Sequence, residues 1–352
     1  MENKIEMAEN FRPHPSHQVP ADLSHMWLVI AISNTPRYRR RYDLLWPFLD
    51  MVKQAGINHV LVEMQLGDRT FMVTEKGNPN HVQIRGDDEF WHKENLQNIG
   101  WVRAQELDSK IREVMFCDAD LRPMAHPRAW FEECWHSIQH YVAAQCFEYI
   151  MNLDWESNPL NGPRRSFMGS YCRGARKMPV FRGQGLDQSK NSEDSGAFWL
   201  GSPGGAWIWR HDALMQVGGL LDICPLGSAD WHMGQGLLGF LEPVEGEHWH
   251  PDYAQALYTW QERALHWIKK DVGFVPGGVV HDNHGPMAYR YYVNRKMILV
   301  ENEFQPSKDF KRGPNGLYQL ETWDPRQINL RDDVRDYFRA RMEDLQEFRT
   351  VK

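Results

Sequence analysis

Two aspartates directly after an apolar run are the first residues able to carry chemistry. Asp118-Ala119-Asp120 follows the apolar segment 113–116. Two carboxylates at i and i+2, where a strand ends and the chain turns, can face one hard cation, and that cation can hold a diphosphate. A solvated turn is the alternative, because Asp is common in turns and short patterns recur by chance. The pattern predicts a divalent metal site with Asp118 and Asp120 as ligands.

A second group pairs a carboxylate with an imidazole. Asp230 and His232 lie two residues apart, shortly after Gly227. A carboxylate can deprotonate a hydroxyl nucleophile that lies within hydrogen-bond reach. The alternative is that Asp230 caps the helix that follows. We expect Asp230 and His232 to be the catalytic residues, with the cap as the competing role.

A third group follows the apolar pair at 279–280, which is typical of a strand. It contains His281, His284, Arg290 and Tyr292 within twelve residues. His281 can complete a metal site begun by the aspartates, while the other three can bind phosphate oxygens. Several such residues in one short segment favour function over the structural role that a single histidine usually has.

One further histidine pair competes for the metal. His248 and His250 lie two residues apart, just before a predicted helix over 251–268. Their position at a helix start favours an ordinary surface role, but the sequence leaves open whether they or His281 bind the metal.

These groups need elements that bring them together, and the first half of the chain provides a pattern. Apolar runs of strand length alternate with helical patterns, and the strands are expected at 26–33, 59–63, 81–85 and 113–116. This alternation predicts an α/β fold, with an open, mainly parallel sheet and helices on both faces. Ligands of such sheets bind beyond the carboxyl ends of the strands. The polar residues at those ends are Ser33, Asn34, Glu63, Asp87, Asp88, Asp118 and Asp120.

The remaining patterns divide the chain into segments. Residues 1–25 are polar and contain several prolines, which is typical of a flexible lead-in. The main domain is expected over 26–300, and it includes an irregular stretch at 157–198 that suits an acceptor loop or lid. A C-terminal extension follows over 301–352, with an amphipathic closing helix expected at 331–349. A helix is also expected to begin near Pro47, and a single strand over 144–153.

Composition narrows the function classes. The net charge of -7 excludes a whole-surface attraction to nucleic acid or to an anionic membrane. No apolar run approaches the roughly 20 residues of a membrane helix, and the acidic N-terminus is not that of a signal peptide. Five cysteines without a CxxC pair favour a reducing, cytoplasmic setting. No P-loop, GxGxxG or GxSxG motif occurs, which argues against the mechanisms that depend on them.

The order of these features resembles metal-dependent glycosyltransferases of the GT-A fold over about residues 26–300. More narrowly, 227–233 and the segment from His281 to Arg295 resemble glycosyltransferase-like proteins of phages and bacteria. The elements that carry the resemblance are Ala31-Ile32-Ser33-Asn34, Glu63, residues 93–100, the DxD of Asp118-Ala119-Asp120, the Gly-Gly-Leu-Leu-Asp of residues 218–222, and Asp230.

The resemblance implies transfer of a hexosyl or pentosyl group from a nucleotide sugar, most often a UDP-sugar, to a hydroxyl acceptor with Mn²⁺ or Mg²⁺. It assigns the metal to Asp118, Asp120 and His281. The family's usual Glu-Asp pair is Ala229-Asp230 here, which leaves open whether Asp230 is an inverting base or positions the acceptor. The donor is assigned to Ser33, Asn34, Glu63, Asp88, Asn95, Asp118, His284, Arg290 and Tyr292.

Two other functions fit the same residues. The acidic strand ends could serve a two-metal nucleotidyltransferase or phosphoesterase, although that chemistry needs more converging carboxylates. A non-catalytic carbohydrate-binding protein on the same fold is the other alternative.

The acceptor is indicated only by charge. Between residues 157 and 192, seven basic residues accompany a single aspartate, Asp187. A solvated flexible loop is one interpretation. The other is that the basic loop at 164–190 meets a polyanion, such as DNA of a phage that carries hydroxymethylated bases, in the host cytoplasm.

Overall fold

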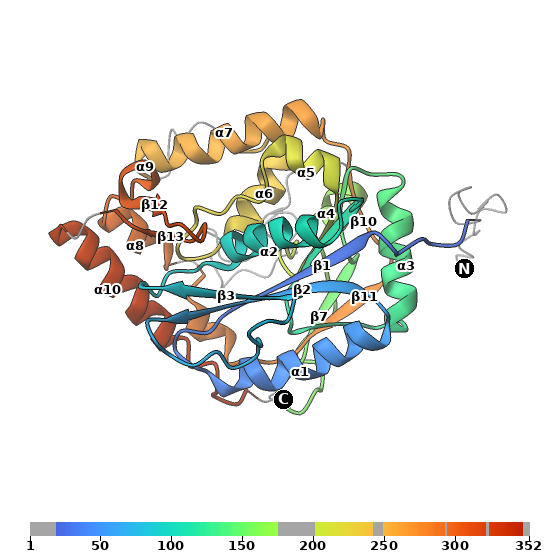
Figure 1. The fold of residues 1–352 in the computed structure, drawn as a ribbon, viewed down its shortest axis with the longest axis horizontal. Coiled ribbons are helices and arrows are strands. Elements are labelled where there is room, and N and C mark those ends of the chain that lie inside the picture. Colours follow the sequence, from blue (N-terminus) through green and yellow to red (C-terminus); the bar gives the residue numbers. More distant parts are fainter. Residues whose placement is uncertain (1–18, 175–200, 242–248, 293, 322–323, 348–352) are drawn as a thin grey trace, which may run out of the picture.

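A seven-stranded sheet with helices on both faces forms the centre of the protein (Figure 1). The computed structural model describes residues 19–174, 201–241, 249–292, 294–321 and 324–347. The strand order is β10-β6-β9-β4-β1-β2-β3, and β9 alone runs antiparallel to its neighbours. The strands are β1 (Met26–Ser33), β2 (Asn58–Leu66), β3 (His81–Gly86), β4 (Glu113–Cys117), β6 (Ala143–Gln145), β9 (Ala206–Arg210) and β10 (Val272–Phe274).

Alternate residues of β1 enter two different cores. Trp27 and Val29 pack in the cluster that contains Leu96 and Trp101 of α2, whereas Leu28 and Ile30 belong to the cluster on the other face. Burial on both faces explains why the strand is an unbroken apolar run. The helices that contribute to the first cluster include α2 (Lys93–Leu107), α5 (His211–Val217), α6 (Ala229–Leu238) and α7 (Pro251–Trp267), and those of the second are α1 (Arg39–Gln54) and α3 (Pro127–Ile138). The predicted α/β class is therefore confirmed.

A second, four-stranded sheet brings the third group of candidate residues to the first. Its order is β5-β11-β7-β8, with β5 (Leu121–Pro123), β11 (Gly278–His281), β7 (Tyr149–Asn152) and β8 (Arg164–Arg165). His281 pairs with Leu121 in the antiparallel β5–β11 register. Because Asp120 directly precedes Leu121, this pairing brings Asp120 and His281 close together although they are 161 positions apart in sequence.

The C-terminal helix packs on the first of the two hydrophobic clusters. This helix, α10 (Pro325–Ala340), starts with a capping box in which Asp324 accepts from the amide of Gln327. The other elements are α4 (Phe167–Arg173), the 3₁₀ helix η2 (Met287–Arg290), α8 (Lys296–Glu301), α9 (Pro306–Asp309), and the hairpin of β12 (Phe310–Arg312) and β13 (Tyr318–Leu320). Among the described residues, no helix is both long and apolar enough to cross a membrane.

Three boundaries differ from the predictions. The first helix begins at Arg39, and Pro47 lies inside it on an exposed side where water can reach the carbonyl that loses its partner. The expected strand over 144–153 is two strands, β6 and β7, which belong to different sheets. The closing helix ends at Ala340, so Met342 and Leu345 are about half exposed, at 51% and 46%.

Candidate active site

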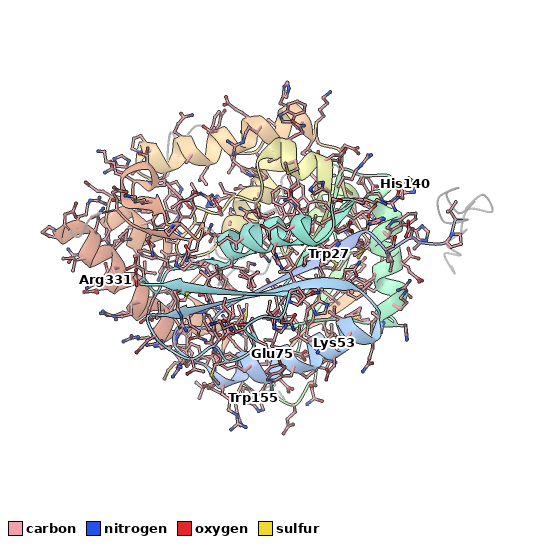
Figure 2. The ribbon with its side chains drawn as sticks, in the orientation of Figure 1. Trp27, Lys53, Glu75, His140, Trp155 and Arg331 are labelled. Carbon is pink, nitrogen blue, oxygen red and sulfur yellow. The ribbon has the colours of Figure 1, made fainter. Side chains whose placement is uncertain are left out.

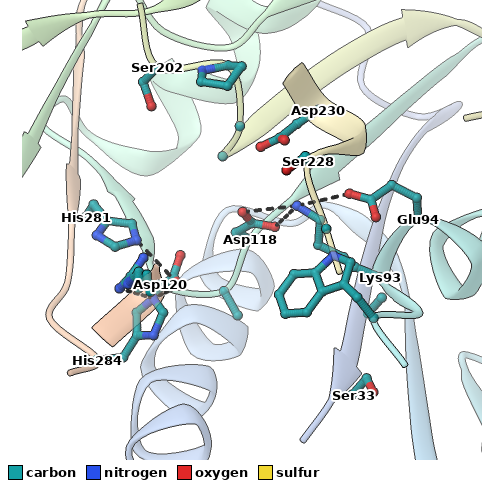
Figure 3. Close-up of a pocket in the computed structure, with 18 of the residues that line it drawn as sticks. Ser33, Lys93, Glu94, Asp118, Asp120, Ser202, Ser228, Asp230, His281 and His284 are labelled. Atoms are coloured by element: carbon teal, nitrogen blue, oxygen red, sulfur yellow. Dashed lines mark hydrogen bonds and ion pairs between the residues drawn. The ribbon is translucent and has the colours of Figure 1, made fainter. Parts of the chain in front are cut away.

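A cavity of about 230 Å³ opens where β1, β4 and β11 end. Figure 3 shows the aspartates of the β4 end, the two histidines and the start of α6 around it. The polar residues that line it are Ser33, Arg41, Lys93, Glu94, Asp118, Asp120, Ser202, Ser228, Asp230, His281, His284, Arg290, Tyr292, Arg295 and Arg341, and Trp91 adds an aromatic wall. The sheet topology therefore brings members of all three groups of predicted residues to one cavity.

Asp120, His281 and His284 form a cluster suited to a metal. One ligand atom from each lies within 4.8 Å of the others. The Oδ2 atom of Asp120 is 2.9 Å from Nε2 of His284 and 3.7 Å from Nε2 of His281. Figure 3 shows Asp120 between the two imidazoles. Carboxylate oxygens and imidazole nitrogens are ligands of Mn²⁺ and other divalent ions.

The charge states of this cluster fit a cation. Burial alone raises the pKa of Asp120, but the two histidines and Arg290 hold it below its usual range. Burial lowers the pKa of His281 to about 3, so its ring is neutral near pH 7 and its lone pair is free for a ligand bond. The second carboxylate oxygen of Asp120, Oδ1, is buried and makes no hydrogen bond. A divalent ion would satisfy that oxygen.

Asp118 lies in the cavity but has a different partner. Its carboxylate oxygens accept from Nζ of Lys93 at 3.1 and 3.4 Å. Burial raises the pKa of Asp118, although Lys93 opposes the shift. The structure thus places His284, which was expected to bind phosphate, beside Asp120 and His281. The role of Asp118 as a metal ligand stays a prediction.

Four arginines form a cationic wall of the cavity. The guanidinium of Arg290 lies 2.9 Å from Nε2 of His284 and 3.2 Å from the hydroxyl of Tyr292. Arg295 donates to Oγ of Ser228 at 2.6 Å. Guanidinium groups bind phosphate oxygens through paired, charge-assisted hydrogen bonds. The full set is Arg41, Arg290, Arg295 and Arg341.

Asp230 lies across the cavity from the histidines, in the first turn of α6. The N-cap position of this helix is held by Ser228, which has a φ of 74° and makes no capping hydrogen bond with its side chain, so Asp230 lies inside the helix and is not its N-cap. Strained backbone of this kind is held by its surroundings and concentrates at functional sites. A Cβ atom at Gly204 would lie 2.2 Å from Oδ2 of Asp230, so the carboxylate occupies space that only a glycine leaves open.

His232 is not among the residues that line the cavity. It is buried between aromatic rings, with centroids 6.3 Å from Trp249 and 6.2 Å from Tyr253. Burial lowers the pKa of His232 to about 4. This imidazole lies on the buried side of α6, against Tyr253 of α7, and a catalytic role for it stays a prediction.

Among the residues predicted to bind the nucleotide-sugar donor, Ser33 lines the cavity together with Asp118, His284, Arg290 and Tyr292. Four others do not line it: Asn34, Glu63, Asp88 and Asn95. Glu63 accepts three amides, from Met72, Val73 and Thr74, and thereby fixes the loop that follows β2. The remaining three bind backbone groups: Asn34 those of Tyr38, Asp88 the amide of Leu320, and Asn95 the amide of Tyr318. Their predicted contacts with a nucleotide have no support from this geometry and stay predictions.

The competing histidines and the basic loop lie only partly within the described residues. His250 caps α7 by accepting the amide of Asp252 at 3.1 Å, and His248 lies outside the described residues. Arg164 and Arg165 form β8, whereas residues 175–190 of the expected basic loop also lie outside the described part. The long loop predicted at 157–198 is described only as far as residue 174, and there it contains α4.

Several cavity residues were missed from the sequence. Lys93 and Glu94 begin α2, with Nζ of Lys93 3.4 Å from the Glu94 carboxylate. Burial raises the pKa of Glu94 to about 7, although Lys93 opposes the shift. A Lys-Glu pair at the start of a helix that follows a strand was a signal for them. Arg341 and its partner Glu343 lie outside the segment of family resemblance, so nothing marked them.

Side chains far from the cavity hold its walls together. Trp155, labelled in Figure 2, lies beside α1, where the guanidinium of Arg40 is 4.4 Å from the ring centroid. Arg40 also donates to the backbone carbonyl of Asn283 at 2.7 Å. These contacts connect α1 to the segment between the two cluster histidines.

The proteins that match this chain are found among solved structures. No protein-family model matches the sequence, and a search of curated proteins gives no match. Among solved structures, a mutant β-1,4-galactosyltransferase 7 from Drosophila, in complex with manganese, UDP-galactose and xylobiose, matches at 12% identity and a TM-score of 0.27. The match spans 60% of this chain and 59% of that one, so this chain corresponds to about three fifths of that protein's length.

A second solved structure covers more of the chain. It is a putative glucose-1-phosphate thymidylyltransferase from Bacillus anthracis in complex with sucrose, with 8% identity and a TM-score of 0.34 over 83% of this chain and 98% of that one. Both scores are low, so the function of the cavity must be argued from its own residues.

Proposed function

We propose that the protein is a metal-dependent glycosyltransferase that uses a nucleotide-sugar donor. The observation that carries the proposal is the arrangement of three kinds of group around one cavity. A carboxylate and two imidazoles suited to a cation lie beside a wall of arginines, and a separate carboxylate, Asp230, faces them. A nucleoside diphosphate sugar needs all three: a cation and arginines for the diphosphate, and a base for the acceptor.

The metal centre would be Asp120, His281 and His284, with Mn²⁺ or Mg²⁺ as the ion. The two imidazoles favour Mn²⁺, because Mg²⁺ prefers oxygen ligands and an octahedral shell. A bound divalent ion would stabilise the negative charge that develops on the departing diphosphate. The protein's own contribution is the neighbouring Arg290, which lies beside the cluster and can bind the same diphosphate oxygens.

Asp230 is the candidate base. In the transfer, the acceptor hydroxyl oxygen forms a bond to the anomeric carbon as the bond from that carbon to the diphosphate oxygen breaks. The products are the glycosylated acceptor and a nucleoside diphosphate, and the hydroxyl proton passes to Asp230. A carboxylate can accept this proton only within hydrogen-bond reach, which its place on the cavity wall allows. A single displacement of this kind inverts the anomeric carbon; the stereochemistry stays open only if Asp230 positions the acceptor and does not take its proton.

The donor and acceptor are finer parts of the proposal. A UDP-sugar rests on the family resemblance of the sequence. Trp91 lines the cavity beside Lys93 and offers an aromatic surface for a sugar or base. Transfer to hydroxymethylated DNA through the basic segment at 164–190 stays a prediction, because most of that segment lies outside the described residues.

A nucleotidyltransferase is the main alternative. Two-metal phosphoryl chemistry needs carboxylates that bridge two ions about 3.5–4 Å apart. Within the described part of the chain, the single group of three or more metal-ligating side chains contains only one carboxylate, that of Asp120. This composition favours one metal ion and a diphosphate leaving group.

The products distinguish the two reactions. The protein should be incubated with a panel of nucleoside diphosphate sugars and Mn²⁺, and the phosphorus products followed by ³¹P NMR. Glycosyl transfer to water or to an added acceptor gives a nucleoside diphosphate, and Asp230→Asn should slow its release. A parallel incubation supplies nucleoside triphosphates, sugar 1-phosphates and the same ion. Formation of pyrophosphate there, with no nucleoside diphosphate released from the sugar nucleotides, would establish a nucleotidyltransferase and overturn the proposal.

A further inference from the structure

The chain returns to the cavity after its last helix. Residues 341–347, named here the C-terminal strap, run past α1 and the loop between β11 and η2. Asp344 accepts the amides of Arg39 and Arg40 at 3.1 and 2.8 Å, which caps the start of α1. Glu347 accepts the amide of Trp155 through its carbonyl at 2.8 Å. On the other side of the buried Glu343, the amide of Met342 donates to the hydroxyl of Tyr38 at 3.1 Å, so the strap is fixed before and after this residue.

Glu343 contacts both the metal cluster and the arginine wall. Its carboxylate is only 1% exposed, and Oε2 lies 3.4 Å from Nδ1 of His284. Oε1 accepts from Nη2 of Arg41 at 2.8 Å and lies 2.8 Å from Nε of Arg341. Burial alone raises the pKa of Glu343, but Arg341, Arg41 and His284 hold it well below its usual range, so the group is an anion.

The backbone of the strap also requires a close approach at this point. A Cβ atom at Gly285 would lie 2.7 Å from Cα of Glu343, and Gly285 has a φ of +86°. A glycine directly after His284 therefore lets the strap lie against the histidine.

We propose that Glu343 is a positioning residue for the metal centre, which orients His284 through Nδ1 so that Nε2 points toward Asp120. The inference rests on the metal centre of the proposed function. A histidine that binds a metal usually donates its other ring N–H to a carboxylate or carbonyl, which fixes the tautomer and the ring direction. His284 has a carboxylate on each side of its ring. Oδ2 of Asp120 lies 2.9 Å from Nε2, and Oε2 of Glu343 lies 3.4 Å from Nδ1, which makes no hydrogen bond in this structure. A metal ion on Nε2 would place the ring proton on Nδ1, on the side of Glu343.

The same carboxylate joins two functions of the cavity. Arg41 and Arg341 line it and carry charges suited to phosphate, and both pair with Glu343. Movement of Glu343 would therefore disturb a metal ligand and two phosphate-facing groups together. The strap at 341–347, which the sequence marked only as part of an extension, thus becomes part of the site.

Cobalt binding to the full-length protein tests the proposal without any donor or acceptor. Co²⁺ in a site with imidazole ligands gives visible absorption bands that report its coordination. We expect Glu343→Gln to weaken Co²⁺ binding by about 10- to 100-fold, the usual effect of losing a carboxylate partner of a metal-bound histidine, and to change the spectrum. Glu343→Asp keeps the charge beside the two arginines but withdraws it from Nδ1, so it should also weaken binding while the fold is retained.

Asp344→Asn is the matched control, because it alters a neighbouring carboxylate of the strap that contacts only the start of α1. It should lower the melting temperature and leave Co²⁺ affinity within about twofold of the wild type. The proposal is overturned if both Glu343 variants bind Co²⁺ as the wild type does, or if Asp344→Asn weakens binding as much as they do.

The two levels of inference fail differently. If the wild type binds Co²⁺ and the Glu343 variants match it, the role of Glu343 falls while the metal centre stands. If the wild type binds no divalent ion, even with UDP present, the metal centre of the proposed function falls, and the role of Glu343 with it.

Discussion

Gly204 and Asp230 come from different elements and occupy adjoining space. Oδ2 of Asp230 lies where the side chain of any other residue at position 204 would begin, 2.2 Å from an ideal Cβ. Gly204 precedes β9, and Asp230 lies in the first turn of α6. The glycine therefore sets how far the candidate base can approach the cavity wall.

Gly204→Ala should displace the carboxylate of Asp230 and lower kcat on the order of 100-fold, because a misplacement of about 1 Å in a reacting group has an effect of that size. The KM for the donor should change little, since the metal cluster and the arginines are untouched. Steady-state kinetics measure both. Gly162→Ala is the control, because a Cβ there meets nothing within 4 Å. Equal rates for Gly204→Ala and the control would contradict the role of Asp230.

Asp120→Asn should weaken Mn²⁺ binding by at least about 100-fold, because it removes the only carboxylate of the cluster. Loss of a residue that binds the metal should weaken binding more than loss of a residue that only orients a ligand, which has an effect of about 10- to 100-fold. Asp118→Asn should weaken it much less, since that carboxylate is bound to Lys93 at 3.1 Å. Calorimetric titration with Mn²⁺ compares them. Equal losses in the two variants would show instead that both aspartates hold the metal, as the DxD pattern of the sequence predicts.

Arg295→Lys should weaken UDP binding about tenfold, because a lysine keeps the charge but loses the planar fork that binds two oxygens. Arg295 lines the cavity and is held by Ser228 at 2.6 Å. Arg103→Lys, at a partly exposed arginine that pairs with Glu106 and does not line the cavity, is the control. Calorimetry with UDP and Mn²⁺ measures the difference. Unchanged affinity in Arg295→Lys would mean that the diphosphate does not reach this part of the wall.

Glu113 predicts a pH dependence of stability away from the cavity. Burial raises its pKa from 4.5 to about 7, although Arg112 opposes the shift, and its Oε2 makes no hydrogen bond. The folded state therefore prefers the protonated form. This contribution is fully present below the unfolded pKa near 4.5 and is lost as the pH rises through 7.

Glu113→Gln imitates the protonated acid at every pH. Relative to the wild type, its free energy of unfolding should rise by about 1–3 kcal/mol between pH 5 and pH 8. Urea unfolding at the two pH values measures this change. Glu106→Gln, at an exposed carboxylate, should show no such change. Parallel behaviour of the wild type and Glu113→Gln would exclude the shifted pKa.

The sheet could be predicted because its signals are local. The boundaries of β1 match the predicted ones, since burial on both faces makes it an unbroken apolar run. The boundary errors have tertiary causes. Pro47 is accepted within α1 because its side is exposed, and 144–153 divides because its two halves pair with different strands.

Part of the site could also be predicted, because some of its residues carry a local signal. Asp118, Asp120 and His281 were found from their places at strand ends, and the sheet brings them together as expected. That His284, and not Asp118, adjoins Asp120 depends on side-chain direction, which no spacing encodes. Glu343 reaches His284 only through the path of the chain after α10, so it had no local signal.

The central claim is that one cavity binds a divalent ion and a nucleoside diphosphate sugar together. A thermal-shift panel of nucleotide sugars with and without Mn²⁺, in the wild type and in Asp120→Asn, tests it most directly. At about 100 times its dissociation constant, a ligand of the folded state should raise the melting temperature by about 5 °C. We predict such a rise for at least one nucleoside diphosphate sugar, only with Mn²⁺ and only in the wild type. If no nucleotide sugar raises it in the presence of Mn²⁺, or if Asp120→Asn responds equally, the claim is contradicted.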